Sequence, residues 1–237
     1  MADRTTERVL AIGAHIGDMD LAAGPYLAQN VLDGGQSMLL ALTPGERGHP
    51  RMAIDDYKQQ KITEGRDLAS AIGADFEVYE DQSDGLLPAD DAIAARVAAL
   101  IRRWKPTVLL AHWAHSIHSD HENASWIAER ARFLAGLPGW ETDDAPADSR
   151  HGVGRLLYTE NWEDAEDFEA SVATPISDEA HQRWSAGISG QAFARGETYG
   201  FRYIDFYNAQ MIMRGCLNAT SRAVMFSSGR RRSVTRM

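Results

Sequence analysis

Short apolar runs alternate with stretches of helical hydrophobic spacing along the first two thirds of the chain. The apolar runs that are typical of buried strands are residues 9–12, 38–42, 76–79, 107–111 and 156–158. The stretches with helical spacing are residues 20–32, 55–72, 90–104, 120–134 and 178–194. Repeated strand–helix units favour a parallel sheet with helices on both faces. The pattern therefore predicts an α/β fold built on an open, mostly parallel sheet.

The regular pattern weakens in two places. Residues 136–154 are rich in Pro, Gly and Asp and predict a long loop, a feature that often serves function. Beyond residue 195 aromatic residues are frequent, and they suit either an edge of the core or the wall of a pocket. Because no composition shift marks a boundary, we expect one domain over residues 1–237, with residues 195–237 as an appended lid or oligomerisation segment.

Charge and composition exclude several function classes. Lys and Arg total 24 against 34 Asp and Glu, a net charge of −10, which argues against nucleic-acid and anionic-membrane partners. The basic tail at residues 230–236 is expected to be a solvated terminus. No apolar run reaches the ~20 residues of a membrane span, and the polar start lacks a signal peptide. The single Cys216 excludes an intrachain disulfide, so we expect a cytoplasmic protein.

Two groups of His and Asp directly follow predicted strands. His15 and Asp18 follow the first strand, and residues 112–121, which include four of the eight histidines, follow the fourth. Because parallel strands end at the same sheet edge, we expect the two groups to form one site. Two imidazoles, a carboxylate and an open position make a catalytic zinc arrangement. Taken alone, Asp18 could instead cap a helix and His15 could pack in a loop.

These residues also carry a family resemblance. Residues 14–18, AHIGD, and residues 118–121, HSDH, resemble the AHPDD and HPDH motifs of the PIG-L (LmbE-like) N-acetylglucosaminyl deacetylases. Between them, residues 43–46, TPGE, and the segment 61–73 resemble the Thr-x-Gly-Glu loop and the Arg-x-x-Glu helix of that family. The four motifs occur in order within residues 8–160. The resemblance implies a Rossmann-like fold and a metal-dependent deacetylase.

The resemblance also implies roles for individual residues. His15, Asp18 and His121 would hold Zn²⁺ or another divalent metal. His118 would stabilise the oxyanion and assist proton transfer. Asp120 would orient a neighbouring imidazole.

Three other residues near the second motif have no counterpart in the family pattern. We expect His112 in a packed or hydrogen-bonded role and His115 near the pocket mouth. Trp113 and His115 are our candidates for substrate binding. Together with residues 136–154 and the aromatics near Tyr199, Trp113 is expected to wall a cleft beside the metal.

The main departure from the family pattern is Gly17, which stands where the family has its catalytic base. A glycine cannot accept a proton, and loss of a positioned base typically costs 10²–10⁴-fold in rate. The candidate replacements are His118, then Glu46, then Asp20. Restoring the carboxylate with Gly17→Asp is expected to raise hydrolysis at least tenfold, unless Gly17 has a positive φ and the aspartate strains the loop.

The leading expectation is zinc-dependent hydrolysis of an N-acyl amide, namely N-deacetylation of an amino-sugar-like or related small polar substrate. The alternative is a metal-binding relative without the usual base, either a pseudoenzyme or an enzyme repurposed for a different reaction. The expected partner is the small-molecule N-acyl substrate. A homo-oligomer is suggested by family analogy alone.

Overall fold

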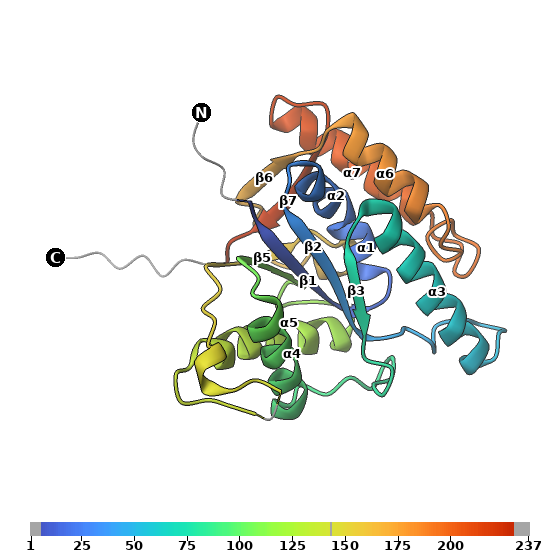
Figure 1. Cartoon of the computed structure of the whole chain (residues 1–237). Helices are drawn as coiled ribbons and strands as arrows, with labels where there is room; N and C mark the ends of the chain where they lie inside the picture. The colour runs from blue at the N-terminus through green and yellow to red at the C-terminus, as the bar shows by residue number, and fades with distance from the viewer. Residues whose placement is uncertain (1–5, 143, 230–237) are drawn as a thin grey trace.

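A computed structural model describes residues 6–142 and 144–229, and it has one seven-stranded sheet with helices on both faces (Figure 1). The strand order is β3-β2-β1-β4-β5-β7-β6. The strands are β1 Arg8–His15, β2 Gln36–Thr43, β3 Asp75–Val78, β4 Val108–Ala111, β5 Arg155–Thr159, β6 Val172–Pro175 and β7 Ala223–Ser227. The α/β class and the Rossmann-like, mostly parallel sheet are confirmed.

The pairing of the strands changes from parallel to antiparallel at β5. The first five strands in the order are parallel to their neighbours, and Ile12 of β1 lies opposite both Leu40 of β2 and Ala111 of β4. The strand β7 then pairs antiparallel with both β5 and β6. The pattern of the sequence did not predict these last two strands, which follow the part of the chain where the alternation of strands and helices weakens.

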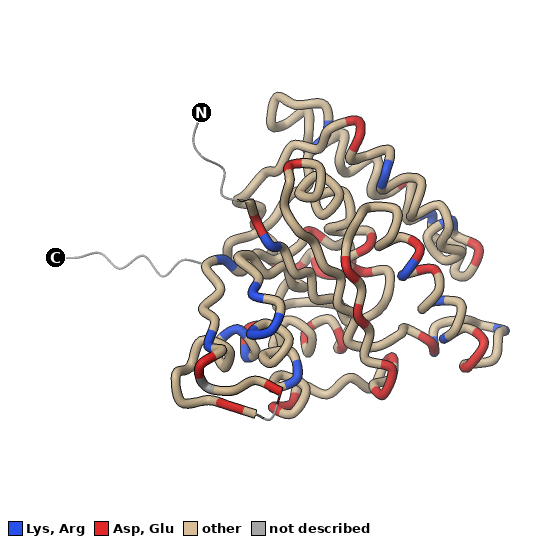
Figure 2. Tube along the Cα trace, viewed as in Figure 1, with Lys and Arg blue, Asp and Glu red and all other residues tan. Residues whose placement is uncertain are grey.

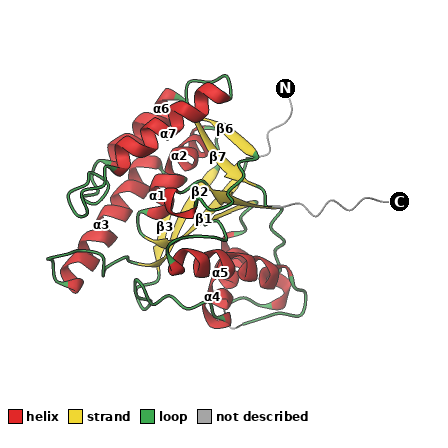
Figure 3. Ribbon diagram, turned by 180° about the vertical axis from the view of Figure 1, so that it is seen from behind, coloured by secondary structure: helices red, strands yellow, loops and turns green. Residues whose placement is uncertain are grey.

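The helices cover the sheet in two layers. On one face lie α1 Asp18–Ala22, α2 Gly24–Leu32, α3 Ile54–Ile72, α6 Asp178–Ile188 and α7 Tyr203–Leu217; on the other lie α4 Asp91–Trp104 and α5 Ser119–Gly136 (Figure 3). Successive side chains of β1 divide between these layers, so that Val9 packs into the first core and Leu10 into the second. Both faces of β1 are thus buried, as its apolar run requires.

Local sequence explains several helix boundaries. The predicted helix over residues 20–32 is two helices, because the chain restarts at Gly24 with Pro25 in the first turn. Gly73 ends α3 in the left-handed conformation with φ of 77°. Asp90 caps α4 by accepting hydrogen bonds from the amides of Ala92 and Ile93. The predicted helix over residues 178–194 ends earlier, at Ile188.

Two predictions concern irregular segments. In the described part of the predicted loop at 136–154, Leu137 and Pro146 are tied to α4, because the buried guanidinium of Arg102 donates to their carbonyl oxygens and to that of Ala135. Among the described residues after 195, α7 packs on the core and β7 belongs to the sheet, so residues 203–227 are not appended to the domain but part of it. The tail arginines at 230–232 and 236 lie outside the described residues.

The charges and the helices of the described segments bear on two of the excluded function classes. Acidic positions occur in both helical layers and in the loops, and basic positions are interspersed among them (Figure 2). Within residues 6–142 and 144–229, every helix is too short or too polar to cross a bilayer.

Candidate metal centre

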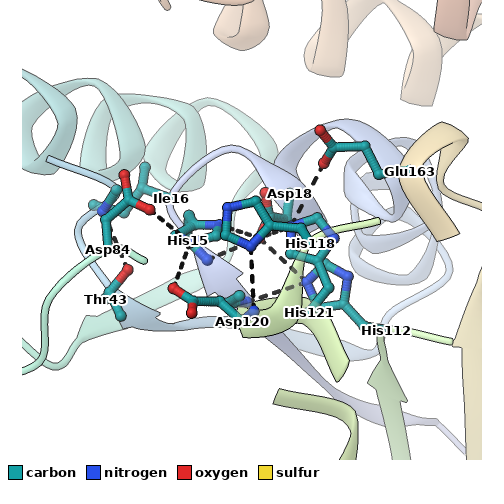
Figure 4. Close-up of polar contacts among 12 residues, drawn as sticks. His15, Ile16, Asp18, Thr43, Asp84, His112, His118, Asp120, His121 and Glu163 are labelled. Carbon is teal, nitrogen blue, oxygen red and sulfur yellow. Dashed lines mark hydrogen bonds and ion pairs between the residues drawn. The ribbon is translucent and has the colours of Figure 1, made fainter. Parts of the chain in front are cut away.

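The two predicted His/Asp groups meet at the carboxyl edge of the sheet. His15 ends β1, and Asp18 begins α1 after a turn of two residues. The neighbouring strand β4 leads through residues 112–118 into α5, whose first turn carries His121. Because β1 and β4 are parallel and adjacent, His15, Asp18 and His121 lie side by side (Figure 4).

Their atoms are spaced as ligands of one ion. Asp18 Oδ2 lies 3.2 Å from His15 Nδ1 and 3.5 Å from His121 Nε2. Ligands about 2.0–2.2 Å from a tetrahedral zinc ion lie roughly 3.4 Å from one another. The imidazole centroids of His15 and His121 are 5.4 Å apart, within the ~6 Å that a shared ion requires. These residues therefore fit a divalent metal ion.

Carboxylates behind the two imidazoles fix their orientation. His15 Nε2 lies 3.2 Å from Asp120 Oδ2, and His121 Nδ1 lies 2.8 Å from Asp164 Oδ1. The other oxygen of Asp164 lies 2.7 Å from His112 Nδ1. Such partners hold the remaining ring nitrogen toward a metal. Asp120 thus occupies the orienting position that the sequence predicted, and His112 is buried and hydrogen-bonded as expected.

Sequence reasoning missed Asp164 and its neighbour Glu163. Both lie on η2, Trp162–Asp164, a short turn that follows β5 and is capped by Asn161, which accepts from the amide of Glu163 at 3.2 Å. Glu163 Oε2 lies 3.6 Å from His121 Nε2. The acidic pair begins five positions after the end of the predicted strand at residue 158, so a search of the loop after that strand would have found it.

Burial and neighbouring charges act differently on these two acids. Burial opposes the charge of Asp164, but the imidazoles of His112 and His121 outweigh it and hold the pKa of this carboxyl well below its usual range. Burial raises the pKa of Glu163 to about 7, and the negative charges of Asp18 and Asp164 add to the shift.

Of the three candidate replacements for the missing base, only His118 faces the site. Its ring stacks on His121 at 4.9 Å and meets His15 edge-on at 4.8 Å. Glu46 instead accepts hydrogen bonds from the Ser83 hydroxyl and the Asp84 amide, and so holds a loop. Asp20 is 3% exposed and accepts from Gln191 Nε2 at 2.7 Å. Glu46 and Asp20 are thus hydrogen-bonded to neighbouring groups and do not line the cavity, so His118 remains the favoured candidate of the three.

Gly17 is required by both conformation and space. Its φ is +115°, and a Cβ at this position would lie 2.3 Å from Cζ of Phe193. The Phe193 ring is held in turn by Lys61, whose Nζ lies 3.9 Å from the ring centroid and donates to the carbonyl oxygen of Ile16. An aromatic ring thus fills the space beside the loop. The prediction for Gly17→Asp made an exception for a positive φ, and that exception applies here, so we expect no gain in hydrolysis from this variant.

A cavity of about 760 Å³ opens beside the His/Asp cluster. One side carries the cluster, and the other is an aromatic wall formed by Trp162, Phe193, Tyr199, Phe201, Tyr203 and Tyr207. The expectation for the aromatics near Tyr199 is therefore confirmed.

The other two expected walls are wrong. Trp113 and His115 border a separate hollow with Tyr158, and the Trp113 indole donates to the carbonyl oxygen of Glu166 at 2.9 Å. No described residue of 136–154 lines this cavity, and Leu137 and Pro146 are bonded to Arg102 of α4 instead. The local turn after a strand decides toward which side of the sheet edge a side chain points. The position of Trp113 next to His112 in the sequence did not reveal its direction.

Comparison with known proteins places these observations in a family. Residues 10–132 match the family model described as PIG-L, GlcNAc-PI de-N-acetylase. The 4-oxalmesaconate hydratase of Pseudomonas putida is 28% identical over 140 residues, which are 56% of this chain and 54% of that protein. The chain thus spans about half the length of this curated relative.

Solved structures share the fold over nearly the whole chain. A conserved protein of Thermus thermophilus is 23% identical with a TM-score of 0.78, and the match covers 98% of this chain and 100% of that one. The 4-carboxy-2-hydroxymuconate hydratase of Pseudomonas putida is 20% identical with a TM-score of 0.80, covering 98% and 99%. The N,N'-diacetylchitobiose deacetylase of Pyrococcus horikoshii is 15% identical with a TM-score of 0.76, covering 93% and 83%. At these identities the likeness shows the fold alone.

Proposed function

The chain belongs to the PIG-L (GlcNAc-PI de-N-acetylase) family, and on that premise we propose that it is a zinc-dependent hydrolase of an N-acyl amide bond. The proposed substrate is a small polar molecule of the amino-sugar type. One observation carries the proposal: His15, Asp18 and His121 present three ligand atoms within 4.8 Å of one another at a cavity large enough for such a molecule.

The residues of the cavity have different proposed roles in the reaction. A divalent ion held by His15, Asp18 and His121 would polarise the acyl oxygen and favour ionisation of water. His118 borders the same cavity, where its imidazole can donate to the developing oxyanion and pass a proton to the departing amine. Asp120 and Asp164 hold the two ligand imidazoles in place.

The free thiol of Cys216 supports our proposal of a cytoplasmic location.

The test is metal analysis followed by an amide panel. The purified protein should hold about one divalent ion per chain and release amine from N-acetyl amino sugars. His118→Ala should keep the ion and lose about 10²–10⁴-fold in turnover. A fully metal-loaded wild type that releases no amine from any N-acyl substrate would contradict the hydrolase.

A second candidate function is hydration of a carbon–carbon double bond in an unsaturated carboxylate. The observation that favours it is the Phe193 ring, which takes the space beside Gly17 where a carboxylate would be needed for the usual hydrolysis. The similarity to a hydratase of Pseudomonas putida points the same way. Here the hydroxyl group of water would add to one carbon of the double bond and the remaining proton to the other. Loss of ultraviolet absorbance from conjugated keto-carboxylates, without amine release from amides, would select this reaction.

A further inference from the structure

We propose that Glu163 is the carboxylate that accepts a proton from the attacking water, in place of the side chain that Gly17 lacks. This inference rests on the proposed hydrolysis. It names a catalytic residue that no family motif contains, on the turn η2 rather than on the loop after β1.

The position of Glu163 carries the proposal. Its carboxylate borders the cavity and lies 3.6 Å from His121 Nε2, the same ring nitrogen that faces Asp18. The three proposed ligands bring their atoms within 4.8 Å of one another, and Glu163 lies outside that group. Glu163 therefore lies at the edge of the His/Asp cluster, outside the proposed set of ligands. There its carboxylate can contact a water molecule in the cavity.

The turn that presents Glu163 is firmly held. Asn161 caps it and also accepts from the Tyr207 hydroxyl at 3.1 Å. Asp164, the next residue, is bonded to His112 and His121. The carbonyl oxygen of Glu163 accepts from the amide of Ile117 at 3.1 Å. A side chain that acts on a bound water needs a backbone that is held in place in this way.

The other carboxylates around the cluster are turned away or occupied. The two nitrogens of the His15 ring face opposite directions, and Asp84 and Asp120 both lie 3.2 Å from Nε2, whereas Asp18 faces Nδ1. Asp84 and Asp120 therefore contact the ring nitrogen of His15 that faces away from Asp18. Glu46 and Asp20 are bonded away from the cavity. The carboxylates that line the cavity are those of Asp18, Asp84 and Glu163. Asp18 is a proposed ligand and Asp84 is paired with His15, which leaves Glu163.

The proposed step balances in atoms and protons. The water oxygen forms a bond to the acyl carbon while one water proton passes to Glu163. The carbon–nitrogen bond then breaks as His118 gives a proton to the departing amine nitrogen, and the proton held by Glu163 passes to His118 and restores it. The products are a carboxylic acid, which ionises in water, and an amine.

The test compares Glu163→Gln with Glu166→Gln, which makes the same change at an exposed acid three positions further along the chain that does not line the cavity. Three quantities are measured on cobalt-loaded and zinc-loaded protein: metal content, the dissociation constant of acetohydroxamate, and amine release. A hydroxamic acid must give up its hydroxyl proton when it chelates a metal, so its affinity reports a nearby proton acceptor without requiring the true substrate.

We expect Glu163→Gln to retain its metal, to bind acetohydroxamate at least tenfold more weakly, and to lose about 10²-fold or more in kcat with little change in KM. Glu166→Gln should match the wild type. Loss of metal from Glu163→Gln would make Glu163 a ligand and overturn the proposal, as would unchanged hydroxamate affinity. If the wild type releases no amine yet the hydroxamate effect holds, the proposed hydrolysis fails and the assignment of Glu163 as a proton acceptor stands.

Discussion

Two regions of the molecule build the cavity, and they differ in how they are specified. The first comprises the ends of β1 and β4, within residues 10–132 that match the family model, and it supplies His15, Asp18 and His121. The second comprises the turn η2 and the aromatic wall, and it comes from residues 161–207. The first region can hold an ion, and the second decides what is presented to that ion. A family match confined to the first region therefore says more about the metal than about the reaction.

The largest effect is expected from breaking the first region. His121→Ala removes one proposed ligand and one of the two imidazole partners of Asp164, so metal binding and activity should fall below detection. The melting temperature should also drop, because the folded state loses the stabilisation that a bound ion provides. Elemental analysis and thermal unfolding measure both. His115→Ala is the matched control, since His115 is exposed and borders another hollow, and a loss of metal there would contradict the comparison.

The contact between the two regions can be tested at Gly17. Gly17→Asp forces a side chain to a φ of +115° and against Phe193, so we expect a loss of about 2–4 kcal/mol in the free energy of unfolding. Activity on amides should not rise. Urea denaturation measures the stability.

The double variant Gly17→Asp/Phe193→Ala sharpens this result. If the clash is the cause, the two changes should couple, with the double variant more stable than the sum of the single effects by about 1 kcal/mol or more. Additive losses would show that strain in the loop alone dictates the glycine. A stable Gly17→Asp single variant with raised amide hydrolysis would contradict our account of the site.

A smaller effect is expected from the aromatic wall. Phe201 stacks on Trp162 with centroids 5.0 Å apart, so Phe201→Ala removes part of the surface facing the ion. We expect metal content to stay the same and KM to rise by about 10-fold, since a lost apolar contact costs roughly 1–2 kcal/mol of binding. Steady-state kinetics measure KM. Trp113→Phe, outside the cavity, should leave KM unchanged.

The smallest effect on turnover is expected at Glu46. Glu46→Ala removes the acceptor for Ser83 and for the Asp84 amide, which should cost about 1–2 kcal/mol of stability. Turnover should change by less than about threefold, because Glu46 does not act on substrate. A fall of 10²-fold in kcat with metal intact would restore Glu46 as a replacement base.

Much of the first region could be predicted from sequence because its signals are local. Buried strands and amphipathic helices leave periodic patterns, and His15, Asp18 and His121 follow strand ends within short motifs. The second region lacks such signals. The role of Asp164 depends on a contact with His121 across 43 positions, and Phe193 acts through Gly17 on a distant element. Tertiary packing decides these pairs, and a single sequence does not show it.

The order of the strands also determines how late in synthesis the sheet can be completed. β6 is an edge strand, and within the described sheet it is joined only to β7, the last strand of the chain. During synthesis, residues 172–175 must therefore wait for residues 223–227 before they can pair, long after the metal-binding residues have left the ribosome. A nascent chain that stops short of residue 223 would leave two strands with open edges, a state that favours aggregation. Completion of this protein thus depends on its final strand.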